Sequence, residues 1–343
     1  MSGAPSARSL LAVMGSRASF LRLLTITAAI VVVFGVLRPT VFLSTSNLQF
    51  LGLASPELAL LSLAIAVTML TGGIDLSVVA IANLSGIVAG TVMIASGGSA
   101  GGVVAGSLAG LGAAMLAGAV NGAIVAGLRV TPILATLGTA QLLGGIGLVL
   151  TGGTAVKGLP PLFTDVARST VAGVPVVFLL LLAVALVLTL LVSRTTLGFR
   201  MRMLGANPVA ARYSGVRSGR VLVSTYVTSG LLAGVAGLVI SSRASGADAD
   251  YGTSYILLGI VVAVLAGVDP EGGYMTVAGV VIATLALLFL STGLLALDVS
   301  SHVVNIAQGA LLITMMVVNR YSGAWSRAVR ERALVRIARP RRA

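Results

Sequence analysis

The sequence of 343 residues is poor in almost every residue type on which soluble proteins and enzymes depend. It contains no cysteine and one histidine, and only 9% of its residues are charged. The absence of cysteine excludes disulfides, thiolate nucleophiles and cysteine-ligated metals. Because a soluble domain has about 25% charged residues, an ordinary soluble fold is excluded as well. With no clustered histidine and acidic residues, we expect neither a metal site nor an enzyme active site.

Most residues of the chain are apolar. They make up 57% of the chain, and the mean hydropathy is +1.09. Many apolar runs approach the ~20 residues that a helix needs to cross ~30 Å of hydrocarbon. Ten candidate spans cover 20–37, 48–70, 78–96, 102–127, 131–151, 173–193, 221–241, 255–268, 276–296 and 303–319. The sequence therefore predicts an all-α, polytopic transmembrane helical bundle. The short eighth run must extend into 251–254 or be buried among its neighbours, and paired glycines such as Gly118 and Gly122 indicate close helix packing.

The basic residues predict the orientation of the bundle. If the N-terminus is cytoplasmic, 18 of the 22 basic residues fall on the cytoplasmic side, as positively charged loops usually do. Both termini are then cytoplasmic, and no cleavable signal peptide is expected. The predicted organisation is a segment 1–19, a transmembrane domain 20–319 with a cytoplasmic loop 194–220, and a basic tail 320–343. We expect that tail to lie against anionic lipid, because it lacks the interleaved aromatic residues of a nucleic-acid platform.

The loop "SRTTLGFRMRMLGANPVAARYSGVRSGR" (193–220) contains one clear helix signal. Asn207 and Pro208 favour a helix start, because asparagine accepts from free backbone N–H groups and proline has none to lose. Gly215 is a natural stop. The pattern predicts a helix of about two turns, from Pro208 to Ser214, outside the membrane. Its apolar face indicates either contact with the lipid headgroups or docking of a cytosolic partner.

A second unusual stretch, "LTGGIDLSV" (70–78), places Asp75 in an apolar environment. A charge at the bilayer centre costs ~2.5–3.5 kcal/mol or more, so this carboxylate must lie near the interface or among polar groups. Three interpretations are open. Gly72 and Gly73 end one helix and Asp75 caps the next by accepting from N–H groups near Ser77 and Val78; the broken segment moves as a gate; or the carboxylate couples transport to protons. The third lacks an intramembrane base or cation partner.

The segment "VLAGVDPEGGYMTVAG" (264–279) resembles "MLTGGIDLSVVAIA" (69–82). Both run from an apolar helix through glycine and aspartate into another apolar helix, and the later one contains Gly272 and Gly273. Transporters are often built from repeats with broken helices in corresponding positions. We therefore expect the two turns to occupy equivalent positions on the inner side of the membrane.

The stretches "TGGIDLSV" (71–78) and "GANPVAARYSGV" (205–216) together resemble the permease subunits of bacterial ATP-binding-cassette importers of monosaccharides. This branch includes ribose, xylose, arabinose, rhamnose and autoinducer-2 permeases, and the resemblance extends from about residue 20 to residue 320. It implies that coupling to the ATPase involves Gly205, Asn207, Pro208, Ala210, Ala211, Arg212, Ser214 and Gly215. It implies a conformational role for Gly72, Gly73, Asp75, Ser77, Gly272 and Gly273. Departures from the branch at Val79, Asp269 and Glu271 leave the substrate open.

The resemblance also implies a set of partners. These are a cytosolic ATPase, a second permease subunit that is identical or related, and an extracytoplasmic substrate-binding protein, assembled at the bacterial cytoplasmic (inner) membrane. ATP and Mg²⁺ would bind the ATPase and not this chain, because Lys157 in "TGGTAVKGL" lacks the G-K-[ST] pattern of a nucleotide-binding loop. The expected function is that of a permease subunit of a sugar importer, without enzyme activity of its own. The alternative is an ion-coupled secondary transporter of small polar solutes.

Polar residues within the predicted spans are candidates for the sugar pathway. Because amides are costly to expose to lipid, we expect each to face the bundle interior, where it either lines the pathway or bonds a neighbouring helix. The candidates are Asn83, Asn121, Thr136, Thr139, Gln141, Asn305 and Gln308. The outer loops at 152–172, 242–254 and 294–302 are expected to dock the binding protein. Its acidic groups are expected to meet Lys157, Arg168 and Arg243, and its basic groups Asp248 and Asp250.

Overall fold

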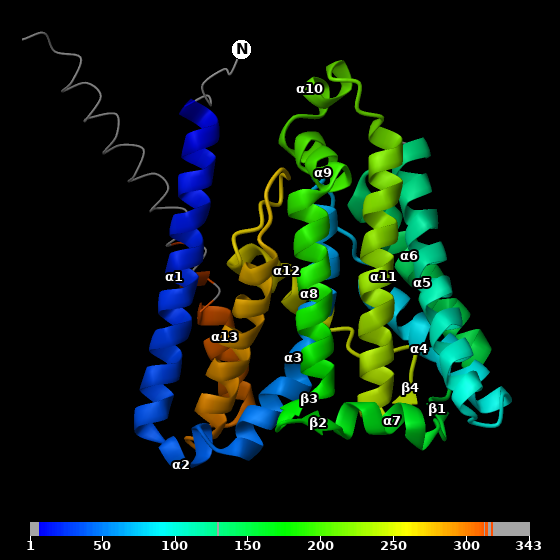
Figure 1. Ribbon diagram of the computed structural model, residues 1–343, viewed down its shortest axis with the longest axis vertical. Coiled ribbons are helices and arrows are strands. Elements are labelled where there is room, and N and C mark those ends of the chain that lie inside the picture. Colours follow the sequence, from blue (N-terminus) through cyan, green and yellow to red (C-terminus); the bar gives the residue numbers. More distant parts are fainter. Residues whose placement is uncertain (1–6, 129, 312, 315–316, 318–343) are drawn as a thin grey trace, which may run out of the picture.

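The computed structural model describes residues 7–128, 130–311, 313, 314 and 317. In this part of the chain helices run between the two ends of one bundle (Figure 1), which confirms the predicted polytopic helical architecture. The helices are α1 (Ala7–Leu37), α2 (Pro39–Phe42), α3 (Thr45–Met69), α4 (Val78–Ala95), α5 (Ala100–Leu128), α6 (Pro132–Thr151), α7 (Pro161–Arg168), α8 (Val176–Arg194), α9 (Thr196–Ala206), α10 (Pro208–Tyr213), α11 (Ser218–Ala244), α12 (Tyr255–Leu265) and α13 (Val277–Leu295).

Eight of these helices are long and apolar enough to cross a membrane. They are the Phe20–Leu37 part of α1, and α3, α4, α5, α6, α8, α11 and α13. The helix α12 matches the short eighth run and has only 11 residues. It packs against α3 and α13 with one face. That face contains the buried residues Gly259, Val262, Ala263 and Leu265, whereas Leu257 is 72% exposed, so this run is only partly buried among its neighbours. The predicted tenth span is helical over 301–311, the rest of it lies largely outside the described residues, and the number of ten stays a prediction.

Two short antiparallel strand pairs close one end of the described bundle. β1 (Val156–Lys157) pairs with β4 (Gly246–Ala247), and β2 (Thr170–Val171) pairs with β3 (Val174–Pro175). In Figure 1 these pairs lie at the bottom together with α2 and α7, and we call this the α7 end. At the top are α9, α10 and the start of α1, and we call this the α10 end.

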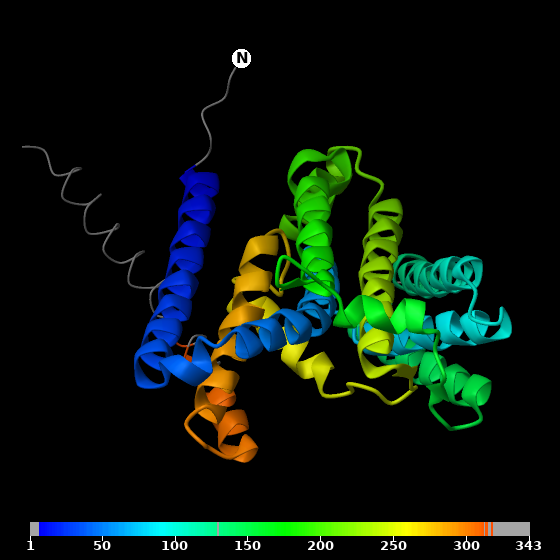
Figure 2. The same cartoon turned by 60° about the horizontal axis from the view of Figure 1, so that its bottom comes forward.

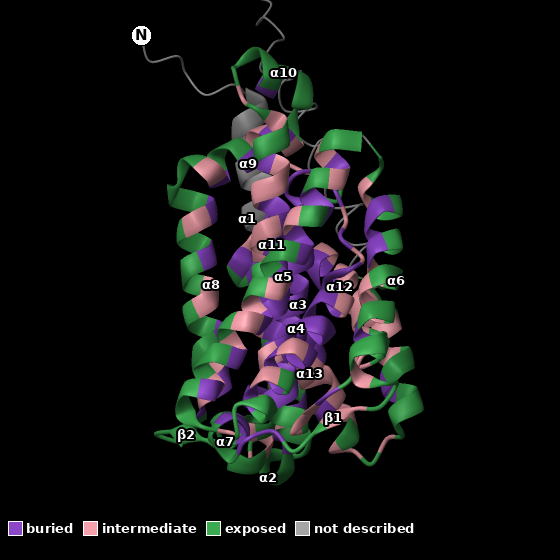
Figure 3. Cartoon of the chain, turned by 90° about the vertical axis from the view of Figure 1, so that its right-hand side faces the viewer, coloured by how far each residue is buried: buried purple, intermediate pink, exposed green. Residues whose placement is uncertain are grey.

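The core of the bundle is built around α3. Every residue from Ser55 to Leu70 is buried, whereas exposed residues follow the outer faces of α6 and α8 (Figure 3). Figure 2 shows α4 to α6 on one side of α11, and α1 with α13 on the other. The predicted close packing is present, because a Cβ at Gly122 in α5 would lie 2.6 Å from the Cα of Val223 in α11.

Candidate functional site

The predicted helix after Asn207 is present as α10. The Asn207 Oδ1 accepts hydrogen bonds from the backbone N–H groups of Val209 (3.0 Å) and Ala210 (2.9 Å). Pro208 occupies the first turn, where its missing N–H leaves no bond unmade. Gly215 follows the helix with a φ of +77°, a conformation that favours glycine. Local sequence signals therefore define both ends of a helix of only six residues.

The outward face of α10 is apolar. Val209 is 53% exposed and Tyr213 is 90% exposed, and Arg212 beside them is exposed as well. Ala211 is the one buried residue of this helix, which packs mainly against α9. Exposed apolar side chains at the tip of the bundle gain free energy when another surface removes them from water. This face fits either a protein partner or the lipid headgroups, the two interpretations that the sequence allows.

The helix α9 precedes α10 within the predicted cytoplasmic loop 194–220, where the sequence predicts only the helix after Asn207. The hydroxyl of Thr195 caps α9 by accepting from the backbone N–H of Gly198 at 3.1 Å. Leu197, Met201 and Leu204 pack into the core at the spacing of one helical face. That spacing is visible in the sequence, but the arginines between these residues mask it.

The two related turns, 70–77 and 266–276, lie against each other and against α9. The Gly273 N–H donates a hydrogen bond of 2.9 Å to the carbonyl oxygen of Leu70. A Cβ at Gly272 would lie 2.8 Å from both the Cα of Gly205 and the backbone nitrogen of Gly72. A Cβ at Gly205 would overlap the Leu70 carbonyl oxygen. We call this contact of Leu70, Gly72, Gly205, Gly272 and Gly273 the glycine junction.

The glycine junction joins main chain to main chain. Three of its glycines have positive φ values, +80° at Gly72, +103° at Gly272 and +88° at Gly273, so side chains are disfavoured by backbone conformation as well as by space. Each turn leads directly into a long helix, α4 or α13. The two turns thus lie in direct contact, and their equivalence on the inner side of the membrane stays a prediction. The helix α9 therefore contacts the segments that lead into both helices.

Asp75 is fully buried in the first of these turns. Its Oδ1 accepts from the backbone N–H of Ser77 at 2.9 Å and from the Ser77 hydroxyl at 2.6 Å. The Ser229 hydroxyl of α11 lies 3.5 Å from Oδ2. Ser77, and not Asp75, occupies the N-cap position of α4. The capping interpretation is thus right about acceptance from Ser77, whereas Val78 is not a partner.

Neighbouring helices hold the segment around Asp75 in place. The Asn121 side-chain amide in α5 donates to the Ser77 hydroxyl at 2.7 Å. The Thr136 hydroxyl in α6 accepts from the backbone N–H of Leu76 at 3.0 Å. Both side chains face the interior, as predicted, and each is fully buried. They support the turn instead of lining an open space.

The other amides divide into two groups. Asn83 faces the interior and donates to the carbonyl oxygens of Ala249 (2.8 Å) and Tyr251 (2.9 Å), and Gln308 donates to the Ser291 hydroxyl at 2.7 Å. Gln141 and Asn305 are exposed on this chain, so the prediction that they face the bundle interior is wrong. These two residues belong to α6 and to the segment 301–311, which lie at the edge of the bundle. Only one face of such a helix meets the interior, so a residue at a neighbouring position faces outward.

Near the α7 end Arg243, which is predicted to lie in a docking loop, forms an ion pair with a buried carboxylate. Arg243 Nη1 lies 2.9 Å from Glu57 Oε1, and the two side chains are 33% and 1% exposed. The hydroxyls of Tyr251 and Tyr255 each lie 3.4 Å from Glu57 Oε2. Burial and the adjacent carboxylate raise the pKa of the Tyr251 phenol, which stays protonated as a donor. The helix α11 continues to Ala244, so Arg243 lies in its last turn and not in a loop. Because its guanidinium is paired with Glu57, Arg243 is not free for docking.

Comparisons with known proteins match most of the chain. The family described as the branched-chain amino acid transport system / permease component matches residues 47–316. The D-allose transport system permease protein AlsC of Escherichia coli (strain K12) is 32% identical over 300 residues, which cover 86% of this chain and 90% of that protein. The autoinducer 2 import system permease protein LsrD of the same strain is 32% identical over 303 residues, covering 84% and 87%. LsrD of Yersinia enterocolitica is 32% identical over 270 residues, covering 76% and 79%. No solved structure matches.

Proposed function

The chain belongs to the family of permease components of the branched-chain amino acid transport system, and on that premise we propose that it is the transmembrane permease subunit of an ATP-driven sugar importer. The sugar is a monosaccharide or a similarly small polar solute. Support for this class of substrate comes from relatives that are named for D-allose and for autoinducer 2 and that align over most of their length. The chain itself forms the membrane pathway.

The exposed helix α10 is connected to the two turns 70–77 and 266–276, and this connection is the main support for the proposed function. The helix α10 presents Val209 and Tyr213 outside the bundle, and α9 joins it to the glycine junction. An external partner that moves α10 therefore has a short structural route to α4 and α13. A permease that takes its energy from another protein needs a route of this kind.

Three protein partners belong to the proposed assembly. A cytosolic ATPase docks on α10 and binds ATP and Mg²⁺, while this chain binds no cofactor and catalyses no reaction. A second permease subunit, identical or related, completes the pathway. An extracytoplasmic substrate-binding protein delivers the sugar to the α7 end.

The proposed orientation places the α10 end in the cytosol and the multi-pass bundle in the bacterial cytoplasmic membrane. Five arginines support it, because positively charged segments flank membrane spans on the cytoplasmic side. They are Arg200, Arg202, Arg212, Arg217 and Arg220, all close to α10 in the chain.

In the proposed transport step, the two ATPase subunits close on their nucleotides and move the docked α10. The helix α9 follows, since Asn207 joins it directly to α10. The glycine junction then passes the displacement to the turns 70–77 and 266–276. Because these turns begin α4 and α13, the ends of both helices shift and the pathway changes the side to which it is open.

Reconstitution in liposomes tests this function. We expect the permease, together with its ATPase and binding protein, to import at least one of D-allose, D-ribose, D-xylose or L-arabinose only when ATP is inside with the ATPase. The double variant Val209→Ser/Tyr213→Ser should lower substrate-stimulated ATP hydrolysis about tenfold or more, because docking contacts buried at the centre of an interface carry most of its energy. Elution volume and thermal unfolding check that the variant is folded.

The matched control is Val36→Ser in α1, an apolar residue that is also exposed (75%) but lies near the opposite end, outside the loops expected to dock the binding protein. It should leave stimulated hydrolysis unchanged. Uphill accumulation of sugar by the permease alone, driven by a proton or sodium gradient, would overturn the proposal in favour of a secondary transporter.

A further inference from the structure

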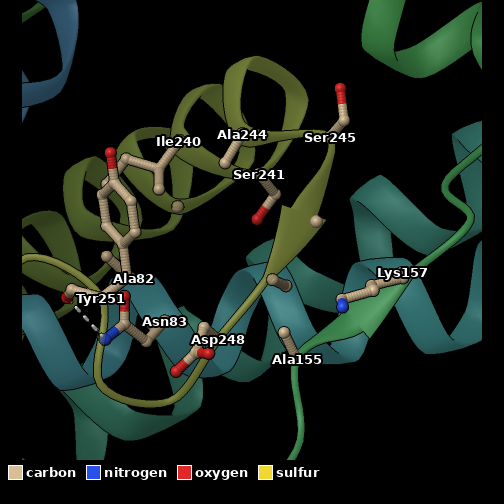
Figure 4. A pocket seen from close by; sticks show the side chains of 13 residues that line it. Ala82, Asn83, Ala155, Lys157, Ile240, Ser241, Ala244, Ser245, Asp248 and Tyr251 are labelled. Atoms are coloured by element: carbon tan, nitrogen blue, oxygen red, sulfur yellow. Dashed lines mark hydrogen bonds between the residues drawn. The ribbon is translucent and has the colours of Figure 1, made fainter.

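A cavity of about 330 Å³ lies beside β1 and β4 at the α7 end of the bundle (Figure 1), and Figure 4 shows it from close by. Its walls come from α4, α11, β1 and the segment that follows β4. Sites for small organic ligands have volumes of about 300–1,000 Å³. The volume of this cavity is at the lower end of that range and suits a ligand of few atoms.

Polar side chains meet in this cavity from separate elements. Lys157 on β1 and Ser241 on α11 point into the space between these elements in Figure 4, and Asp248 lies beside Asn83 across from them. An ammonium and a hydroxyl supply donors, and a carboxylate supplies acceptors. The cavity therefore offers donors and acceptors to one ligand at the same time.

Two of these groups are already oriented by the protein. Asn83 uses its side-chain N–H groups on the carbonyl oxygens of Ala249 and Tyr251. An amide NH₂ has two donors, and both are used in these bonds. The Oδ1 of Asn83 remains as an acceptor for a ligand. Asp248 Oδ1 accepts from the backbone N–H of Asp250 at 2.8 Å, which fixes the plane of the carboxylate. Groups held in this way bind a ligand without a further loss of side-chain freedom.

The aromatic wall of the cavity is fixed from behind. Tyr251 lines the cavity, and its hydroxyl lies 3.4 Å from Glu57 Oε2. Glu57 in turn is paired with Arg243 at 2.9 Å. Through Glu57, the ion pair therefore holds the Tyr251 wall of the cavity in position.

We propose that this cavity is a binding site for the transported sugar at the outer entrance of the permease. The inference rests on the proposed function and adds the place and the residues of recognition. Each sugar hydroxyl is both a donor and an acceptor, and the cavity provides Lys157 as donor with Asp248 and Asn83 as acceptors. Because Lys157 and Asp248 have opposite charges, the site favours a neutral polyhydroxylated ligand over an anion or a cation.

The absence of cysteine from the chain allows a direct test. The variant Ala155→Cys places one thiol at the cavity wall, and Thr154→Cys places one beside it on a residue that does not line the cavity. The full-length permease in complex with its ATPase, without the binding protein, is treated with a membrane-impermeant maleimide in the presence of D-allose, D-ribose, D-xylose or L-arabinose. The sugar that the complete assembly imports should slow alkylation of the cavity thiol about tenfold at ten times its dissociation constant. Alkylation of Thr154→Cys should not change.

Substitutions in the Ala155→Cys background identify the groups that bind. Lys157→Met and Asp248→Asn should each raise the sugar concentration for half-protection about 10-fold or more, because hydrogen bonds to charged groups are the strong ones. Asp250→Asn is the matched control, since its side chain does not line the cavity, and it should have little effect. Alkylation rates without sugar, together with thermal unfolding, show whether each variant is folded and the thiol accessible.

The outcomes separate this inference from the function on which it rests. Import of a sugar by the assembly without protection of the Ala155→Cys thiol overturns the cavity site and leaves the sugar importer intact. Protection that is unchanged in both Lys157→Met and Asp248→Asn overturns the site as well, since the sugar then acts from elsewhere. If the assembly imports no sugar at all, the proposed function itself fails.

Discussion

The two ends of the bundle are stabilised by different kinds of atoms. At the α10 end, the glycine junction packs the main chain of α9 against the main chain of two turns. At the α7 end, side-chain contacts add to the two strand pairs, with Arg243 on Glu57 and Asn83 on two carbonyl oxygens. Main-chain contacts leave little between them free to adjust, whereas oriented side chains offer hydrogen-bonding groups to a ligand. On the proposed function, the α10 end transmits the movement of the ATPase and the α7 end recognises the sugar.

Removal of Arg243 should give the largest loss of stability, because it breaks the side-chain network at the α7 end. Arg243→Met leaves the Glu57 carboxylate, 1% exposed, without its partner. An unpaired buried charge costs about 3–5 kcal/mol. Thermal or denaturant unfolding in detergent measures the loss. The double variant Glu57→Gln/Arg243→Met should recover most of it, since no charge then remains.

The ion pair of Arg38 with Asp298 is the control for this prediction. Its atoms are 3.8 Å apart and its side chains are 49% and 91% exposed. Exposed pairs contribute about 0–1 kcal/mol, so Arg38→Met should have a small effect. Equal losses in Arg38→Met and Arg243→Met would show that burial is not what distinguishes the α7 network.

A side chain in the glycine junction should have the next largest effect. Gly205→Ala places a methyl group against the Leu70 carbonyl oxygen and the backbone nitrogen of Gly273. Overpacking of this kind costs about 1–3 kcal/mol, and we expect coupled ATP hydrolysis to fall further than stability does. Gly219→Ala in α11 is the control, because its Cβ would meet only Ala126 at 3.8 Å. Full coupling in Gly205→Ala would refute the assignment of transmission to this end.

The turn next to the junction should tolerate an isosteric change better than a truncation. Asp75→Asn keeps an oxygen that can accept from the N–H and hydroxyl of Ser77. We expect it to cost about 1 kcal/mol, and Asp75→Ala to cost more because the Ser77 donors lose their acceptor. Unfolding and transport assays on both variants compare the two. Loss of transport in Asp75→Asn with normal stability would mean that the carboxylate has a role in coupling through its charge.

The smallest effect on stability is expected on the outward face of α10. Tyr213 is 90% exposed, so Tyr213→Ser should change the free energy of unfolding of the isolated permease by about 0.5 kcal/mol or less. The same substitution should weaken retention of the ATPase on the immobilised permease. A large loss of stability would indicate that this face is covered within the permease itself.

The sequence predicts what is local in this structure. Asparagine, proline and glycine give α10 nearly its observed bounds, because helix caps depend only on residues within one turn. Long apolar runs predict the spanning helices, because the run too is a local property of the sequence. The helix α9 is also a local feature, since Leu197, Met201 and Leu204 recur at the spacing of one helical face although arginines lie between them.

Contacts between distant segments are not accessible in this way. The glycine junction combines residues from three parts of the chain, and no local pattern states that Gly205 meets Gly272. The Arg243–Glu57 pair joins α11 to α3, and a difference of three residues in the predicted end of α11 moved this arginine into a loop. The side of α6 that exposes Gln141 depends on which helices surround it.

The contact between α9 and the two turns leaves little room for local adjustment. Flexible side chains could absorb a small shift by changing rotamer, but backbone atoms already in contact have no such freedom. The glycine junction also shares no residue with the cavity at the α7 end. On the proposed function, substitutions that change the transported solute would therefore leave the junction unaltered.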